Sequence, residues 1–135
     1  MTLDVTQFAA EAAEQEQGYT FEVEDAAGRI YLRADGKPQT ITVLGSYAPV
    51  VRRAMDANLD RSIRGKMTAA SLMAGRIRVA QAAITGWTLE LGGQPVPLTP
   101  ENVATLMRAA LWILEQVEAG MRGDRDFSRR ASENS

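Results

Sequence analysis

Carboxylates, hydroxyls and one Gly-containing turn are the groups in this chain whose types and spacing could do chemistry. The chain contains no cysteine and no histidine, which removes thiol nucleophiles, disulfides, the usual zinc ligands and the commonest general base. Serine and threonine hydroxyls therefore have no imidazole to activate them. Asp35-Gly36-Lys37 is typical of a hairpin turn, because it lacks the glycine spacing and the following helix of a phosphate-binding loop.

Two pairs of closely spaced carboxylates remain as candidates for a metal site or a proton-sharing pair. Asp124 and Asp126 alternate with arginines, which indicates a solvated segment, since an all-oxygen metal site needs about six ligands on a rigid loop. Glu115 and Glu118 are neighbours on an expected helix, where such a pair usually belongs to the solvent-facing side. We therefore expect no enzymatic activity, no cofactor, no metal and no small-molecule substrate.

The length and composition favour one globular domain. With 135 residues, 45% of them hydrophobic, the chain can bury a core without disulfides or metals. Its first residues lack the basic and apolar regions of a signal peptide, and no stretch approaches the ~20 apolar residues of a membrane span. The absence of cysteine fits a cytosolic protein, and we expect no membrane partner.

Charge is distributed unevenly, although the formal net charge is only -2. Residues 1–25 contain acidic residues but no lysine or arginine, whereas residues 52–78 are rich in arginine. Either the two segments face each other and neutralise, or the basic helices form a surface for an acidic partner. We favour neutralisation, because the arginines fall on polar helix faces. Nucleic acid is the weaker candidate partner, since no aromatic residues accompany the arginines and the chain is acidic overall.

Periodicity predicts the elements that must position any functional residue. Residues 1–17 are expected to form an N-terminal helix or arm ending at Gly18. Period-two alternation predicts a meander of three antiparallel strands, at residues 20–24, 29–33 and 39–44. Helices are expected from about residue 46 to 65, 68 to 85 and 100 to 119, the last closed by Gly120 as a left-handed cap.

These elements predict an α+β fold. A small antiparallel three-stranded meander near the N-terminus should pack on a C-terminal bundle of about three helices. Residues 1–122 form a single domain in this prediction, and residues 123–135 form a flexible polar tail. The second helix should bury a stripe of Tyr47, Val50, Val51, Ala54, Met55 and Leu59.

The stretch from Ile84 to Asn102 connects the last two helices and has strong local signals. Gly92-Gly93 predicts a turn, and Pro95 and Pro97 keep their neighbours extended. Thr99-Pro100 predicts a helix start, with a capping hydroxyl followed by a proline that needs no donor.

Two tryptophans allow alternative interpretations. Trp87 is in phase with Leu89 and Leu91, which favours a place in the core or at a hinge over a partner contact. Trp112 lies off the main apolar stripe of its helix, so it either packs beneath the sheet or forms an exposed patch.

One pattern of residues resembles a known family. It consists of Ile84, Gly86 and Trp87; then Gly93, Pro95, Val96, Pro97, Leu98, Thr99, Glu101 and Asn102; and finally Asp126 and Phe127. With these residues the chain is similar to the small tail assembly chaperones encoded by long-tailed bacteriophages and prophages. The resemblance is strongest over residues 84–103. Leu98 stands where an aromatic residue is common, and the N-terminal arm has no counterpart in the pattern.

The resemblance implies a function without catalysis. Such chaperones hold tail tube subunits and the tape-measure protein soluble in the host cytoplasm, and they are not retained in the mature virion. We hypothesise that the client contact comes from the segment between Trp87 and Leu98 and from the tail. The expected partner-binding residues are Trp87, Leu89, Leu91, Pro95, Pro97, Leu98, Trp112 and Phe127.

Two other classes stay open at this point. A structural tail component, such as a tail terminator, a tube protein or a head–tail connector, would also be small and without catalytic residues, and it would form rings. A DNA-binding regulator is the third class, and its binding to DNA would weaken steeply with salt. Homo-oligomerisation is possible in the first two classes.

Overall fold

The computed structural model describes residues 3–123. Within them the chain is α+β, with five helices, a three-stranded antiparallel sheet and a separate two-stranded hairpin. The helices are α1 (Val5–Gln17), α2 (Pro49–Arg64), α3 (Ala69–Ala83), α4 (Pro100–Ala109) and α5 (Leu111–Met121). The strands are β1 (Tyr19–Glu22), β2 (Thr40–Val43), β3 (Ile84–Trp87), β4 (Glu90–Leu91) and β5 (Gln94–Pro95).

The sheet differs from the predicted N-terminal meander. Its order is β1-β2-β3, and β3 comes from residue 84 onward, far from the N-terminus in sequence. The expected middle strand, residues 29–33, forms only isolated bridges, Glu24 with Ile30 and Leu32 with Pro38. The prediction was wrong because local alternation does not say which strands pair, and the far edge of β2 is taken by a strand distant in sequence.

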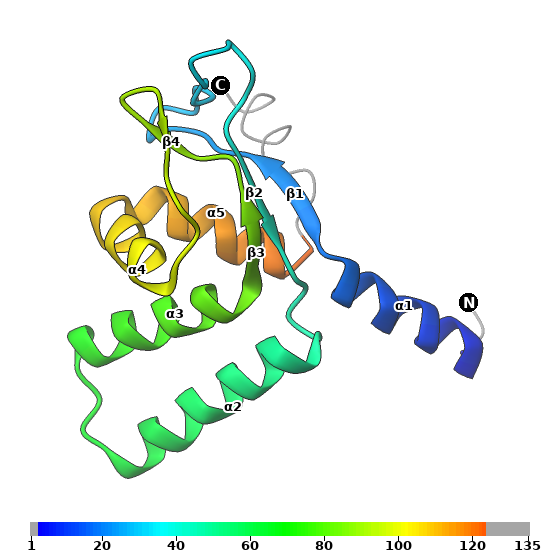
Figure 1. The fold of residues 1–135 in the computed structure, drawn as a ribbon. Helices are drawn as coiled ribbons and strands as arrows, with labels where there is room; N and C mark the ends of the chain where they lie inside the picture. The colour runs from blue at the N-terminus through cyan, green and yellow to red at the C-terminus, as the bar shows by residue number, and fades with distance from the viewer. Residues whose placement is uncertain (1–2, 124–135) are drawn as a thin grey trace.

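Two helix boundaries also differ. The third helix was expected to continue to Thr85, but α3 ends at Ala83 and the chain turns directly into β3. The expected single helix over residues 100–119 is two helices, separated at Ala110, where φ is -134° and ψ is 83°. This break lets α4 pack on α3 while α5 packs on β1 and β2, as Figure 1 shows.

Gly120 lies inside α5 and is not the left-handed cap that was predicted. A Cβ atom at this position would lie 3.0 Å from Val43 and 3.4 Å from Phe21. The glycine therefore allows α5 to approach the sheet closely. Gly18 has a different role: its φ of +82° turns the chain from α1 into β1.

The core lies between the sheet and helices α3, α4 and α5. Its largest fully buried side chains come from β2, α2, α4 and α5 and from the residue after β1: Val23, Ile41, Val43, Val51, Met107, Leu114 and Val117. The predicted stripe of α2 is only partly buried, since Tyr47, Val50 and Leu59 are exposed. The reason is that α2 packs chiefly on α3, so the described residues leave its outer flank exposed.

The start of α4 confirms the predicted cap. The Thr99 hydroxyl accepts a hydrogen bond from the Asn102 amide at 3.1 Å, and Pro100 occupies the first turn. We expect Thr99→Ala to lower the free energy of unfolding by about 1 kcal/mol, because an amide of the first turn loses its acceptor. Urea unfolding followed by circular dichroism measures this. Thr105→Ala, at an exposed position within the same helix, is the control and should change the free energy by less than about 0.5 kcal/mol.

Candidate functional site

The segment from β3 to the start of α4 crosses one side of the molecule as a short hairpin followed by an extended strap. β4 and β5 pair through Leu91 and Gln94, and Gly92-Gly93 forms the turn with positive φ at both glycines. Residues 96–99, which we call the strap, then lead into α4. We call residues 88–98 the hairpin surface.

Three hydrogen bonds hold the strap against the body. The Trp87 indole nitrogen donates to the Val96 carbonyl at 2.7 Å, and the Val96 amide donates to the Leu89 carbonyl at 2.9 Å. The Asn102 side-chain amide donates to the Pro97 carbonyl at 2.8 Å. Pro95 and Pro97 lie on either side of Val96 and restrict the backbone further. The strap therefore has little conformational freedom left to lose when it binds another molecule.

The structure separates the residues predicted to contact a partner into two groups. Leu89 is buried in the core, and Trp87 is half-buried against it, so both support the hairpin from beneath. This agrees with the favoured interpretation of Trp87. The exposed members are Leu91 (68% exposed), Leu98 (39%), Trp112 (36%), Pro95 and Pro97. Phe127 lies outside the described residues.

A groove of about 330 Å³ lies between the hairpin and helices α4 and α5. Its floor and walls are mostly apolar, with Leu89, Leu91 and Val96 on the hairpin side and Leu106 and Ile113 on the helices. Grooves of this size and character are typical of sites that take an apolar side chain or a short apolar segment.

Trp112 does not line this groove itself but contacts Tyr31, which does. The indole nitrogen of Trp112 donates to the Tyr31 hydroxyl at 3.0 Å. Of the two interpretations of Trp112, the structure supports the exposed one, because its side chain lies at the surface rather than beneath the sheet. Tyr31 packs partly against the core, whereas its neighbour Leu32 is exposed.

Three polar residues that sequence reasoning missed hold the loop of residues 24–38 beside the hairpin. Glu90 accepts a hydrogen bond from the Ala34 amide at 2.8 Å, and its other oxygen lies 3.7 Å from the Arg33 Nε. The Gln39 side chain accepts from the Glu90 amide at 3.1 Å and donates to the Leu32 carbonyl at 3.1 Å. Gln39 follows a proline and directly precedes β2, so no sequence signal marked it.

Gln116 is the other missed residue, and it joins α5 to the backbone of Glu24 from within the core. Its buried side-chain amide accepts the Glu24 N–H at 2.8 Å and donates to the Glu24 carbonyl at 2.9 Å. It also donates to the Trp112 carbonyl, one turn earlier in the same helix, at 2.9 Å. A glutamine among the buried positions of a mostly apolar helix, LWILEQVEAGM, was the signal that could have identified it.

The ionisable groups of the described residues do not converge on the groove. No cluster of three or more His, Cys, Asp or Glu that could hold a metal ion occurs within residues 3–123. The pKa of Asp25 is lowered, chiefly because its carboxylate accepts the Arg29 backbone amide, and the pKa of Asp4 is lowered by its hydrogen bonds with Thr6. Both carboxylates cap local turns. Of the predicted pair Glu115 and Glu118, the latter binds Arg76, with N–O distances of 2.9 and 2.6 Å.

Comparison of the chain with protein-family models, with curated proteins and with solved structures found no match. None of the helices in the described part of the chain is both long and apolar enough to cross a membrane.

Proposed function

We propose that this protein is a phage tail assembly chaperone that binds the tail tube protein, the tape-measure protein, or both during tail morphogenesis. The observation that supports the proposal is the structural role of the residues on which the family resemblance rests. Trp87, Thr99 and Asn102 hold the strap and cap α4, so the pattern encodes one rigid apolar hairpin surface.

The chemistry of this surface suits a transient client contact. Its exposed residues are apolar or proline, and the adjoining groove of about 330 Å³ is open to an apolar segment of a client. A contact limited to these few side chains and one small groove would be weak, which favours release when tail subunits polymerise. A chaperone of this kind acts in the bacterial host cytoplasm and leaves before the virion matures.

Coexpression with the tube and tape-measure proteins encoded beside its gene tests the proposal. The expected result is that a client that precipitates when made alone stays in solution and copurifies with this protein. The mature particle should lack it. Particles that retain the protein, or a purified protein that sizes as a stable ring, would instead assign it to the structural tail or head–tail connector class. Binding to DNA that falls steeply with salt would assign it to the regulators.

A further inference from the structure

Within residues 3–123, helix α1 is an arm that the rest of the chain leaves largely uncovered. It has no buried residue over Val5–Gln17, and Figure 1 shows it leaving the body at the start of β1. One face carries Val5, Phe8 and Ala12 at helical spacing, and Phe8 is 47% exposed. Its charged side chains are all acidic, and Glu11 and Glu16 border this face on its two sides.

The base of the arm is fixed, so its direction is set by the fold. The Gly45 amide donates to the Gln15 carbonyl at 2.9 Å, and the Tyr47 amide donates to the Gln15 side chain at 3.0 Å. A Cβ atom on Gly18 would lie 2.6 Å from the Val43 carbonyl oxygen, so the chain enters β1 with no room for a side chain at the hinge. An exposed apolar face held away from its own core costs free energy unless another surface covers it.

A second surface that is open within residues 3–123 is a groove of about 580 Å³ between α2, α3 and the end of α5. Its apolar wall includes Met55, Met67, Leu72 and Val79, and Leu72 is 51% exposed. The cations that line it are Arg61, Lys66, Arg76, Arg78 and Arg122. Its acidic group, Glu118, is already bound by Arg76.

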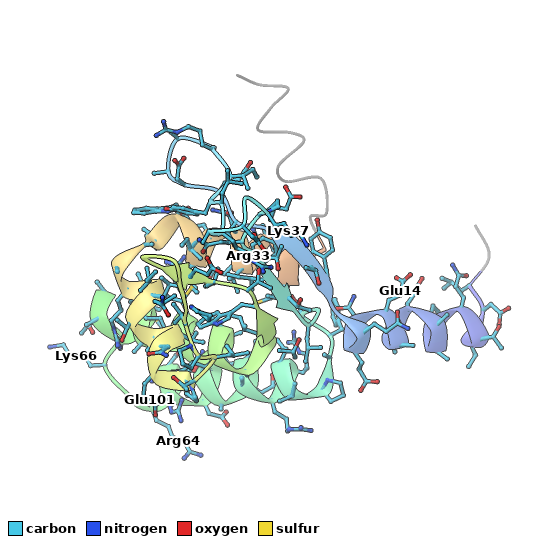
Figure 2. The ribbon with its side chains drawn as sticks, turned by 45° about the horizontal axis from the view of Figure 1, so that its top comes forward. Glu14, Arg33, Lys37, Arg64, Lys66 and Glu101 are labelled. Atoms are coloured by element: carbon cyan, nitrogen blue, oxygen red, sulfur yellow. The ribbon has the colours of Figure 1, made fainter. Side chains whose placement is uncertain are left out.

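The arm and the groove match in polarity, charge and length. An acidic helix with one apolar face complements an apolar groove rimmed by cations. At 1.5 Å per residue, the 13 residues of α1 extend about 20 Å, slightly less than the 16 residues of α2. Within one chain the charges do not meet: Figure 2 shows Glu14 on the projecting arm and Arg64 and Lys66 on the opposite side of the body. Neutralisation of the acidic and basic segments was predicted, but the acidic residues of α1 do not reach the basic residues at the tip of the α2–α3 pair of the same chain.

We propose that α1 of one copy docks into the α2–α3 groove of a second copy. A two-fold axis makes the contact self-complementary, so each chain contributes one arm and receives one. Two exchanged arms bury twice the area of one and bring the contact toward the ~1,600 Å² of a stable interface. The charge of the groove favours α1 over residues 124–135, because that segment carries three arginines among its charged residues. The inference is independent of the proposed function, since the hairpin surface takes no part in it.

Charge reversal on each side of the contact tests the exchange. One variant combines Glu11→Lys with Glu16→Lys on the arm, and the other combines Arg61→Glu with Lys66→Glu in the groove. Analytical ultracentrifugation of the full chain should show a dimer, and each variant alone should dimerise at least about 100-fold more weakly, since like charges then face each other. Mixing the two variants should restore a dimer, because each arm again meets a groove of opposite charge.

Matched controls separate this contact from general charge effects. Glu22→Lys on β1 and Arg53→Glu on α2 reverse exposed charges outside the arm and the groove, and both variants should dimerise like the parent. Removal of residues 124–135 should also leave the dimer intact, and loss of the dimer there would assign the groove to that segment. A parent protein that stays monomeric up to about 0.5 mM, or a variant mixture that does not associate, would overturn the exchange.

Discussion

Replacing Gln116 with leucine should lower the free energy of unfolding by about 3 kcal/mol, although leucine is close in size and more apolar. The side-chain amide of Gln116 is buried and exchanges two hydrogen bonds with the backbone of Glu24, at 2.8 and 2.9 Å. Leucine would remove both partners and leave those backbone groups to be desolvated without this pairing. The effect is large because a side chain on α5 joins a segment 92 residues away in sequence.

Urea unfolding followed by far-ultraviolet circular dichroism measures this loss. The slope of the unfolding free energy against urea concentration should be unchanged if only the stability is altered. Gln94→Leu is the matched control, since Gln94 is an exposed glutamine on β5, and it should change the free energy by less than about 0.5 kcal/mol. A loss below about 1 kcal/mol in Gln116→Leu would mean that water replaces the amide, and Gln116 would then not be the anchor of the loop.

The same residue shows where sequence reasoning reaches its limit. Caps and turns depend on a few neighbouring residues, and for that reason the Thr99 cap and the Gly92-Gly93 turn were predictable. The pairing of β2 with β3 joins residues more than 40 positions apart. Alternation in sequence shows that a segment can pair but not with which partner, so the meander was the nearest local solution.

Helix geometry was predictable only as far as it followed from local signals. Residues 100–121 have a continuous helical pattern, and no proline or glycine marks the break at Ala110. The break follows from packing, because α4 must meet α3 while α5 meets the sheet. Gly120 gave a local signal that was wrong. Its position near the expected helix end predicted a cap, whereas its lack of a Cβ atom allows a close approach to Val43 and Phe21.

For the candidate site, the sequence identified the right segment but not the role of each residue. Trp87 and Leu89 face inward and Leu91 faces outward, although all three share one phase of a strand pattern. The alternation fails beyond Leu89 because the chain leaves the sheet after β3 and turns into a separate hairpin. Tyr31, which contacts Trp112, and Gln116, which contacts Glu24, act through contacts that only the folded chain creates.

Placing aspartate at both Leu91 and Leu98 should reduce capture of the client by at least about tenfold, equivalent to 1.4 kcal/mol of binding free energy. Both side chains are exposed, so the charges are solvated in the free protein and should change its stability by less than about 0.5 kcal/mol. Binding of an apolar client segment would remove water from these carboxylates. The free-energy cost of this desolvation exceeds the free energy gained from the apolar contact. Copurification of coexpressed tube or tape-measure protein, measured as the ratio of client to chaperone, gives the readout.

The matched control places the same two charges elsewhere on the molecule. Leu59→Asp combined with Ile63→Asp alters two exposed apolar residues of α2, which lie outside the hairpin surface and do not line the α2–α3 groove. This control should capture the client as the parent does. If both double variants lose capture alike, the client recognises general apolar exposure rather than the strap. If the Leu91 and Leu98 variant captures normally, the hairpin surface is not the client site, whatever the outcome for arm exchange. The two proposals therefore fail separately, because one depends on residues 88–98 and the other on α1 and the basic groove.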